Sequence, residues 1–267
     1  MRIIYIISAV LAVLSAVICV RHISQIWMPF AFFFAEIIAL SFLYWFVLGI
    51  FSLFFSVKKE YKKPSKLAFR MLNAAYYFVN TAARIRVHVS GTELIPKDKR
   101  FLFVSNHISR FDPMIQSYVL RRYPMAFISK PANFKIPIGR RFMNGTCYIA
   151  INRESPRQAA KSITRAAELI KENLISVAVY PEGHRGNGIE LGEFKPGSLK
   201  TALKADCSIV VAVIEGTQNV KKNFPWHVTD VYLNIIDVME PCKEKTVDLA
   251  VHIKDKIQRE LDIKKIP

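Results

Sequence analysis

The feature that most constrains this chain is an N-terminal stretch with almost no charge. Within residues 1–57 only Arg2, Arg21 and Glu36 are charged, so 36 of the 38 basic and 20 of the 21 acidic side chains fall in the other 210 residues. Such a stretch is not an ordinary surface segment, because its many apolar side chains are stabilised by leaving water. The remaining residues are numerous enough to form a domain with its own core.

Two apolar runs divide this stretch. Residues 3–20 would form a helix about 27 Å long, close to the hydrocarbon thickness of about 30 Å. Residues 30–57 end at the basic cluster 58–64, which we expect on the cytoplasmic side, near anionic headgroups. We predict a membrane-associated helical hairpin with a basic tail over residues 1–64, either spanning the membrane twice or dipping into one leaflet. A cleaved signal peptide is disfavoured because the first run shows no small-x-small cleavage site.

From residue 65 onward, strand and helix patterns alternate. Residues 65–83 place polar side chains at spacings of three and four, which predicts an amphipathic helix on the core or on the membrane surface. The Asp-Pro step at 112–113 predicts a helix with Asp112 as its N-cap. We therefore predict an α/β domain over residues 65–267, with a mainly parallel sheet flanked by helices. Strands are expected at 84–89, 101–105, 125–129, 147–151, 176–180, 209–214 and 227–236, and further helices at 155–173, 198–204 and 248–263.

A histidine directly follows the buried strand 101–105, where α/β folds place reactive groups. Asp112 comes five residues after His107, so a tight turn would let its carboxylate fix the tautomer of the imidazole. The other ring nitrogen would then be able to take a proton from a hydroxyl group. The simpler alternative is that Asp112 only caps a helix and that His107 is only a loop residue.

Groups suited to binding an anion follow other predicted strands. The loop 181–188 combines glycines with Glu182 and Arg185, and exposed backbone amides beside a guanidinium suit a phosphate or an oxyanion. Arg153 follows a strand, and Lys195 precedes the N-terminus of a helix. Because the carboxyl ends of parallel strands meet at one edge of a sheet, we expect these groups and the histidine to converge.

Together these segments resemble the motifs of the membrane-bound glycerolipid acyltransferases, of the bacterial 1-acyl-sn-glycerol-3-phosphate acyltransferase type. His184 stands where that family usually has Thr, Ala132-Asn133 replace Glu-Leu, and Val211 replaces a proline. Residues 106–112 match the family motif N-H-x-x-x-x-D, and residues 149–153 match its apolar strand that ends in Arg. Residues 180–185 match F-P-E-G-T-R, and residues 194–197 match F-K-x-G. Residues 127–130 and 136–139 resemble the lysine-bearing stretch between the first two motifs.

The resemblance implies a 1-acylglycerol-3-phosphate O-acyltransferase of phospholipid biosynthesis. Such an enzyme transfers an acyl chain from acyl-CoA or acyl carrier protein to the sn-2 hydroxyl of 1-acyl-sn-glycerol-3-phosphate and forms phosphatidic acid. It needs no covalent intermediate, metal or cofactor. His107 and Asp112 would be the catalytic dyad. The substrate-binding residues would be Asn106, Lys130, Arg153, Glu182, Gly183, Arg185 and Lys195.

The strongly basic body favours anionic partners, since the chain carries a net charge of +17. We expect it to meet lysophosphatidic acid and anionic lipid headgroups at the cell membrane, with the active domain on the cytoplasmic side and acyl carrier protein as a candidate partner. Nucleic acid is disfavoured by the apolar head and by the lack of a nucleic-acid motif. The alternatives are acylation of another lysophospholipid or of glycerol-3-phosphate, and, outside the enzymes, a lipid-binding membrane scaffold.

Overall fold

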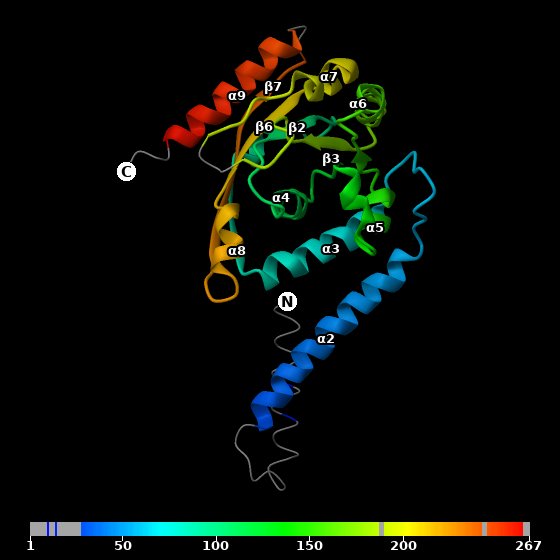
Figure 1. Cartoon of the computed structure of the whole chain (residues 1–267), viewed down its shortest axis with the longest axis vertical. Helices are drawn as coiled ribbons and strands as arrows, with labels where there is room; N and C mark the ends of the chain where they lie inside the picture. Colours follow the sequence, from blue (N-terminus) through cyan, green and yellow to red (C-terminus); the bar gives the residue numbers. More distant parts are fainter. Residues whose placement is uncertain (1–9, 11–13, 15–27, 187–189, 242–244, 264–267) are drawn as a thin grey trace. The chain divides into compact units, whose positions relative to one another are not determined.

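The computed structural model describes residues 10, 14, 28–186, 190–241 and 245–263. The chain divides into two compact units that meet between Phe54 and Phe55 (Figure 1). Apart from Val10 and Leu14, the first run of the predicted hairpin and its tip at Arg21-His22 lie outside the described residues.

The N-terminal unit contains one long apolar helix, α2 (Met28–Ser52). Its stretch Phe30–Ser52 has a mean hydropathy of 2.1, and its 23 residues are enough to cross a hydrocarbon core of about 30 Å. Among the described residues it is the one helix that is long and apolar enough to do so. The helix ends at Ser52, earlier than the apolar run itself, which continues to Val57.

The second unit is built on one mixed sheet. The described strands are β1 (Ile85–Ser90), β2 (Leu102–Ser105), β3 (Met125–Ser129), β4 (Ile149–Ala150), β5 (Ser176–Val179), β6 (Ile209–Glu215) and β7 (Thr229–Met239), in the order β1-β7-β6-β2-β5-β3-β4. Strands β6, β2, β5, β3 and β4 are parallel to one another. Strand β7 pairs antiparallel with β6, and β1 pairs parallel with β7. The predicted mainly parallel sheet flanked by helices is confirmed, with a reversed edge that the sequence pattern did not indicate.

Helices cover both faces of this sheet (Figure 1). One layer holds α6 (Pro156–Lys171), α7 (Pro196–Ala205) and α9 (Thr246–Ile263); the other holds α3 (Lys66–Ala82), α4 (Asp112–Val119) and α5 (Gly139–Gly145), and α8 (Val220–Asn223) precedes β7. Strands β2 and β5 are buried along their whole length, as expected for central strands covered on both faces. Helix α3 packs on the core through Ala68, Leu72 and Ala75.

One predicted strand is shorter in the structure than in the sequence pattern. A strand is predicted over residues 147–151, but only Ile149–Ala150 forms β4. Cys147 has a φ of 60°, which places it in the left-handed region and outside the extended conformation of a strand. The chain therefore turns at Cys147 before β4 begins, and Arg153 follows three residues after its end.

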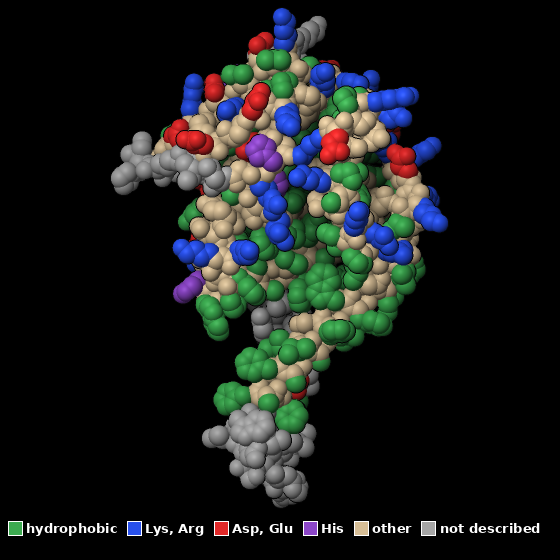
Figure 2. Space-filling view, viewed as in Figure 1, with side chains coloured by type: hydrophobic (Ala, Val, Ile, Leu, Met, Phe, Trp, Pro, Cys, Tyr) green, Lys and Arg blue, Asp and Glu red, His purple; other side chains and the backbone are tan. Residues whose placement is uncertain are grey.

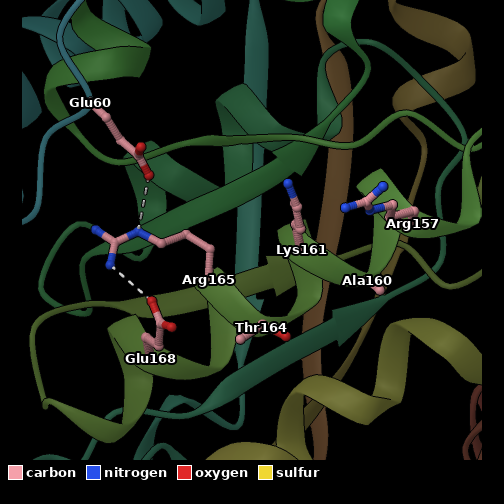
Figure 3. A pocket seen from close by; sticks show the side chains of 7 residues that line it. All are labelled: Glu60, Arg157, Ala160, Lys161, Thr164, Arg165 and Glu168. Atoms are coloured by element: carbon pink, nitrogen blue, oxygen red, sulfur yellow. Dashed lines mark hydrogen bonds and ion pairs between the residues drawn. The ribbon is translucent and has the colours of Figure 1, made fainter.

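The segment that leads into α3 is fastened to α6 by one arginine. The guanidinium of Arg165 donates to the carbonyl oxygens of Tyr61 and Lys62 at 3.1 and 3.0 Å, and it pairs with the carboxylates of Glu60 and Glu168 (Figure 3). An open groove lies beside this arginine on the outer side of α6. Its lining residues are Glu60, Arg157, Ala160, Lys161, Thr164, Arg165 and Glu168, and they include none of the predicted site residues.

Two glycines give a matched test of the fold. Gly91 has a φ of +72°, and a Cβ there would overlap the carbonyl oxygen of Ile235, whereas a Cβ at Gly197 in α7 would meet nothing within 4 Å. We expect Gly91→Ala to lower the free energy of unfolding by about 1–2 kcal/mol or more, because Ala disfavours this conformation. Gly197→Ala should raise it by about 0.5–1 kcal/mol. Chemical unfolding in detergent measures both free energies of unfolding, and equal effects of the two substitutions would contradict the left-handed conformation of Gly91.

Candidate active site

The predicted site residues gather where four neighbouring strands end. Strands β2, β5, β3 and β4 are parallel and adjacent, so their carboxyl ends lie along one edge of the sheet. The residues that follow these ends are Asn106 and His107 after β2, Glu182, Gly183 and Arg185 after β5, Lys130 after β3, and Arg153 after β4.

His107 and Asp112 form a hydrogen-bonded pair. The distance from His107 Nδ1 to Asp112 Oδ2 is 2.8 Å. The same carboxylate oxygen also accepts from the backbone amides of Ile108 and Ser109, at 2.7 and 2.8 Å. Asp112 is fully buried, whereas the His107 side chain remains 19% exposed. The carboxylate therefore holds the proton on Nδ1 and leaves Nε2 as the ring nitrogen that can accept another.

The predicted helix cap at Asp112 is wrong by one position. The residue that caps α4 is Phe111, which makes no side-chain capping bond, and Asp112 is the first residue of the helix. Its carboxylate points back into the loop 107–109 instead of forward to the helix amides. The reason is that one buried oxygen can satisfy two loop amides and the imidazole together, which stabilises the turn that carries His107.

An aromatic ring supports the imidazole from one side. The rings of His107 and Tyr180 stack with centroids 4.1 Å apart and an angle of 12° between their planes. The Tyr180 hydroxyl donates to Gln116 Oε1 at 2.7 Å, and Gln116 Nε2 donates to Ser105 Oγ at 3.1 Å. Gln116 and Ser105 are fully buried. Desolvation by burial, followed by the nearby Asp112 carboxylate, raises the pKa of Tyr180, so the phenol remains a donor at neutral pH.

Asn106 ties β2 to β6 beneath the histidine. Its Nδ2 donates to the carbonyl oxygen of Ile214 at 2.9 Å, and its Oδ1 accepts from the amide of Ile214 at 2.8 Å. The residue is 1% exposed. In this structure Asn106 therefore fixes the strand that presents His107.

Glu182 joins the histidine turn to the glycine-rich loop. One of its carboxylate oxygens accepts from the backbone amide of His107 at 2.9 Å, and the other accepts from the amide of Gly192 at 3.1 Å. The Gly186 amide also donates to the carbonyl oxygen of His107, at 2.7 Å. Because Glu182 is only 1% exposed, these bonds form in a poorly solvated place, where they hold both segments firmly.

Cations surround Gly183 close to this turn. A Cβ at Gly183 would lie at ordinary contact distance, 3.4 Å from Lys195 Cε and 3.5 Å from Arg153 Nη1, so both basic side chains lie next to this residue, whose φ of +74° favours glycine. Desolvation lowers the pKa of Arg153, although a guanidinium remains a cation at neutral pH. Arg185, two residues after Gly183, and Lys130, which directly follows β3, are both exposed. Lys195 and Arg153 are therefore the members of the predicted binding set that lie beside Gly183.

Sequence reasoning missed Tyr180 and Gln116. The signal was present, because Tyr180 stands where the F-P-E-G-T-R motif begins with Phe, and a hydroxyl added to a buried ring needs a partner. Gln116 follows Asp112 by four residues on α4, which places both side chains on the same face of that helix.

A histidine held by a buried carboxylate, with two cations beside Gly183 of the adjoining loop, is an arrangement that can take a proton from a hydroxyl and can bind an anion. Residues 86–215 match the family model described as Acyltransferase. The chain is 31% identical to the 1-acyl-sn-glycerol-3-phosphate acyltransferase of Borreliella burgdorferi over 206 residues, which cover 75% of this chain and 82% of that protein. The chain therefore belongs to the 1-acyl-sn-glycerol-3-phosphate acyltransferase family and is an acyltransferase.

Two further comparisons agree with this assignment. The enzyme of the same name from Haemophilus influenzae is 27% identical over 174 residues, which cover 62% of this chain and 72% of that protein. The crystal structure of the 1-acyl-sn-glycerophosphate acyltransferase PlsC from Thermotoga maritima matches with a TM-score of 0.61 at 24% identity, covering 76% of this chain and 81% of that one. The second match shows that the two proteins share their fold.

The bond from Tyr180 to Gln116 can be tested apart from the stacking. Tyr180→Phe keeps the ring against His107 but leaves the buried Gln116 Oε1 without its donor. We expect the free energy of unfolding to fall by about 1–3 kcal/mol. The turnover number should stay within about twofold of wild type, since the ring remains in place. Thermal unfolding and steady-state kinetics measure both, and unchanged stability would contradict the proposed network.

Proposed function

We propose that this acyltransferase moves an acyl chain from an acyl thioester to the sn-2 hydroxyl of 1-acyl-sn-glycerol-3-phosphate and forms phosphatidic acid. The names of the relatives support this substrate. The observation that carries the proposal is the 2.8 Å bond between His107 Nδ1 and the buried Asp112, which lies beside a cluster suited to a phosphate. The donor is acyl-CoA or acylated acyl carrier protein, and we propose that the reaction uses no cofactor besides this co-substrate.

In this mechanism His107 is the general base. Its Nε2 takes the proton of the sn-2 hydroxyl while the oxygen attacks the thioester carbonyl and forms a tetrahedral intermediate. The carbon–sulfur bond then breaks, and the imidazolium returns the proton to the leaving thiolate. Asp112 stabilises the imidazolium and holds its orientation but does not itself take the proton. No acyl-enzyme forms.

The cations have separate roles in this proposal. Arg153, Arg185 and Lys195 bind the acceptor phosphate, and the first and the last of them lie next to Gly183. The Gly183 amide already donates to the Tyr180 carbonyl oxygen at 3.1 Å. Lys130 is therefore the candidate that stabilises the oxyanion, where one donor typically contributes about 3–4 kcal/mol. Glu182 and Asn106 contribute by holding His107 in place.

The reaction requires the protein to meet lipid. We propose that α2 attaches the enzyme to the cell membrane and that the basic segment 58–63 keeps the α/β unit on the cytoplasmic side, near anionic headgroups. The lipid acceptor then reaches the site from the same membrane. Acyl carrier protein, which is acidic, is the partner expected at the basic surface if it is the donor.

The proposal predicts phosphatidic acid formation by the full-length protein in detergent micelles. The assay compares three acceptors, which are 1-acyl-glycerol-3-phosphate, glycerol-3-phosphate and a neutral-headgroup lysolipid. Each acceptor is tested with acyl-CoA and with acylated acyl carrier protein as the donor. We expect turnover with the first acceptor only, and its loss in His107→Ala with the fold intact. Activity confined to another acceptor would move the function within the family, and no activity with any pair would favour the lipid-binding scaffold.

The Asp112→Asn variant tests whether activity needs the imidazole of His107 to be oriented by a carboxylate, and not only to be present. The amide keeps the size of the side chain but favours the wrong tautomer of His107, so we expect kcat to fall by about a thousandfold to ten-thousandfold. Near-normal turnover in Asp112→Asn would contradict the dyad, even if His107→Ala were inactive.

The phosphate-binding roles predict a selective effect on the acceptor. Arg153→Ala and Lys195→Ala should each raise the acceptor KM by about tenfold to a hundredfold, because each removes one charge-assisted hydrogen bond. The donor KM should change much less. Arg259→Ala, at an exposed position of α9, is the matched control for loss of a positive charge. Equal changes in the two KM values would argue against phosphate binding at Gly183.

A further inference from the structure

The loop between α8 and β7 exposes large apolar side chains at alternate positions. Phe224 is 53% exposed, Trp226 78% and Val228 36%. Trp226 is the most exposed large hydrophobic side chain in the described part of the α/β unit. Exposed aromatic clusters of this kind are uncommon on a soluble surface and mark an interaction site.

The backbone of this loop is held by hydrogen bonds within the protein. Arg84 Nη1 donates to the carbonyl oxygens of Pro225 and Trp226 at 3.2 and 3.0 Å. The amide of Phe224 donates to the Val220 carbonyl, and the amide of His227 donates to the Asn223 carbonyl. Four backbone polar groups of the loop therefore have partners within the protein, which lowers the cost of moving this segment into a lipid interface.

The loop lies at the same edge of the unit as α3 (Figure 1). Arg84 lies two residues after the end of α3, so its bonds join the C-terminal end of that helix to the loop. On the side of α3 away from its buried residues, Leu67 is 38% exposed and Met71 and Phe78 are half-buried. Figure 2 shows hydrophobic side chains gathered along this lower edge of the α/β unit.

Basic side chains border the apolar tip. Lys221 and Lys222 precede it and are exposed, and residues 216–229 contain no acidic side chain. Exposed Lys66 and Arg70 stand on α3 beside Leu67. Aromatic rings beside lysines have the composition of segments that enter the headgroup region, where the rings leave water and the cations meet anionic lipid.

We propose that residues 221–228, together with the outer side of α3, form a second membrane-contact surface, and that Phe224 and Trp226 enter the headgroup region of an anionic bilayer. This inference rests on the proposed function only in requiring a membrane. Helix α2 holds the chain at the bilayer, and 13 residues separate it from α3, so the local concentration of lipid at this surface is high. The contact orients the α/β unit toward its lipid acceptor.

The fluorescence of Trp226 tests this surface without any catalytic step. Trp27→Phe and Trp45→Phe in the full-length protein leave Trp226 as the single tryptophan. In vesicles of phosphatidylcholine and phosphatidylglycerol, we expect Trp226 emission to shift to the blue, to be quenched by acyl-brominated lipid and to be shielded from aqueous iodide. Quenching by iodide alone would overturn the proposal. Shielding from both quenchers would also overturn it, because a second copy or another protein would then cover the loop.

A paired substitution measures what the contact does for turnover. Phe224→Ser with Trp226→Ser should lower kcat/KM on acceptor in vesicles by about tenfold or more, and leave it near wild type in detergent micelles. The matched control is Val247→Ser with Val251→Ser, two positions on α9 that are 58% and 56% exposed and should affect neither assay. Equal losses in vesicles and micelles, or no loss in vesicles, would contradict the proposal. Since the fluorescence needs no turnover, an incorrect acceptor assignment would leave that first test intact.

Discussion

The site depends on the hydrogen bonds that the buried carboxylate of Asp112 accepts. A single oxygen accepts from the imidazole of His107 and from the amides of Ile108 and Ser109. An ionised group without these donors would be strongly destabilised at full burial. The same three bonds shape the turn after β2, so the orientation of the imidazole and the stability of the turn have one origin. This is why the carboxylate points into the loop instead of capping its helix.

Much of this fold follows from local patterns in the sequence. Apolar runs and helix patterns located most elements to within a few residues; the helix predicted over 155–173 is α6, capped by Ser155, whose side chain accepts from the Gln158 amide. The reversed direction of β7 did not follow, because a β-strand pattern contains no information on the direction of its neighbour. The shortness of β4 did not follow either, since the left-handed backbone of Cys147 arises from its surroundings in the folded unit.

The candidate site, like the fold, was predictable from the sequence only in part. His107, Asp112 and the basic residues were identifiable because their side chains carry the chemistry and because parallel strands end at one edge. The contacts of Tyr180 with Gln116 and with the imidazole depend on where α4 lies relative to the residue that follows β5, which spacing along the chain does not define. The aromatic loop at Trp226 was not predicted for another reason. Phe224 and Trp226 precede the predicted strand 227–236, and the sequence alone does not show whether such side chains are buried or exposed.

The carboxylate of Glu182 has a consequence for how this enzyme can change. Because it holds the backbone of His107 with one oxygen and that of Gly192 with the other, one buried side chain joins the histidine turn to the segment at Gly192. A change in that segment therefore also reaches the backbone of His107. If His107 is the general base, as proposed, a substitution that fits this segment to a different headgroup also disturbs the proton transfer, unless a second change restores the position of the histidine.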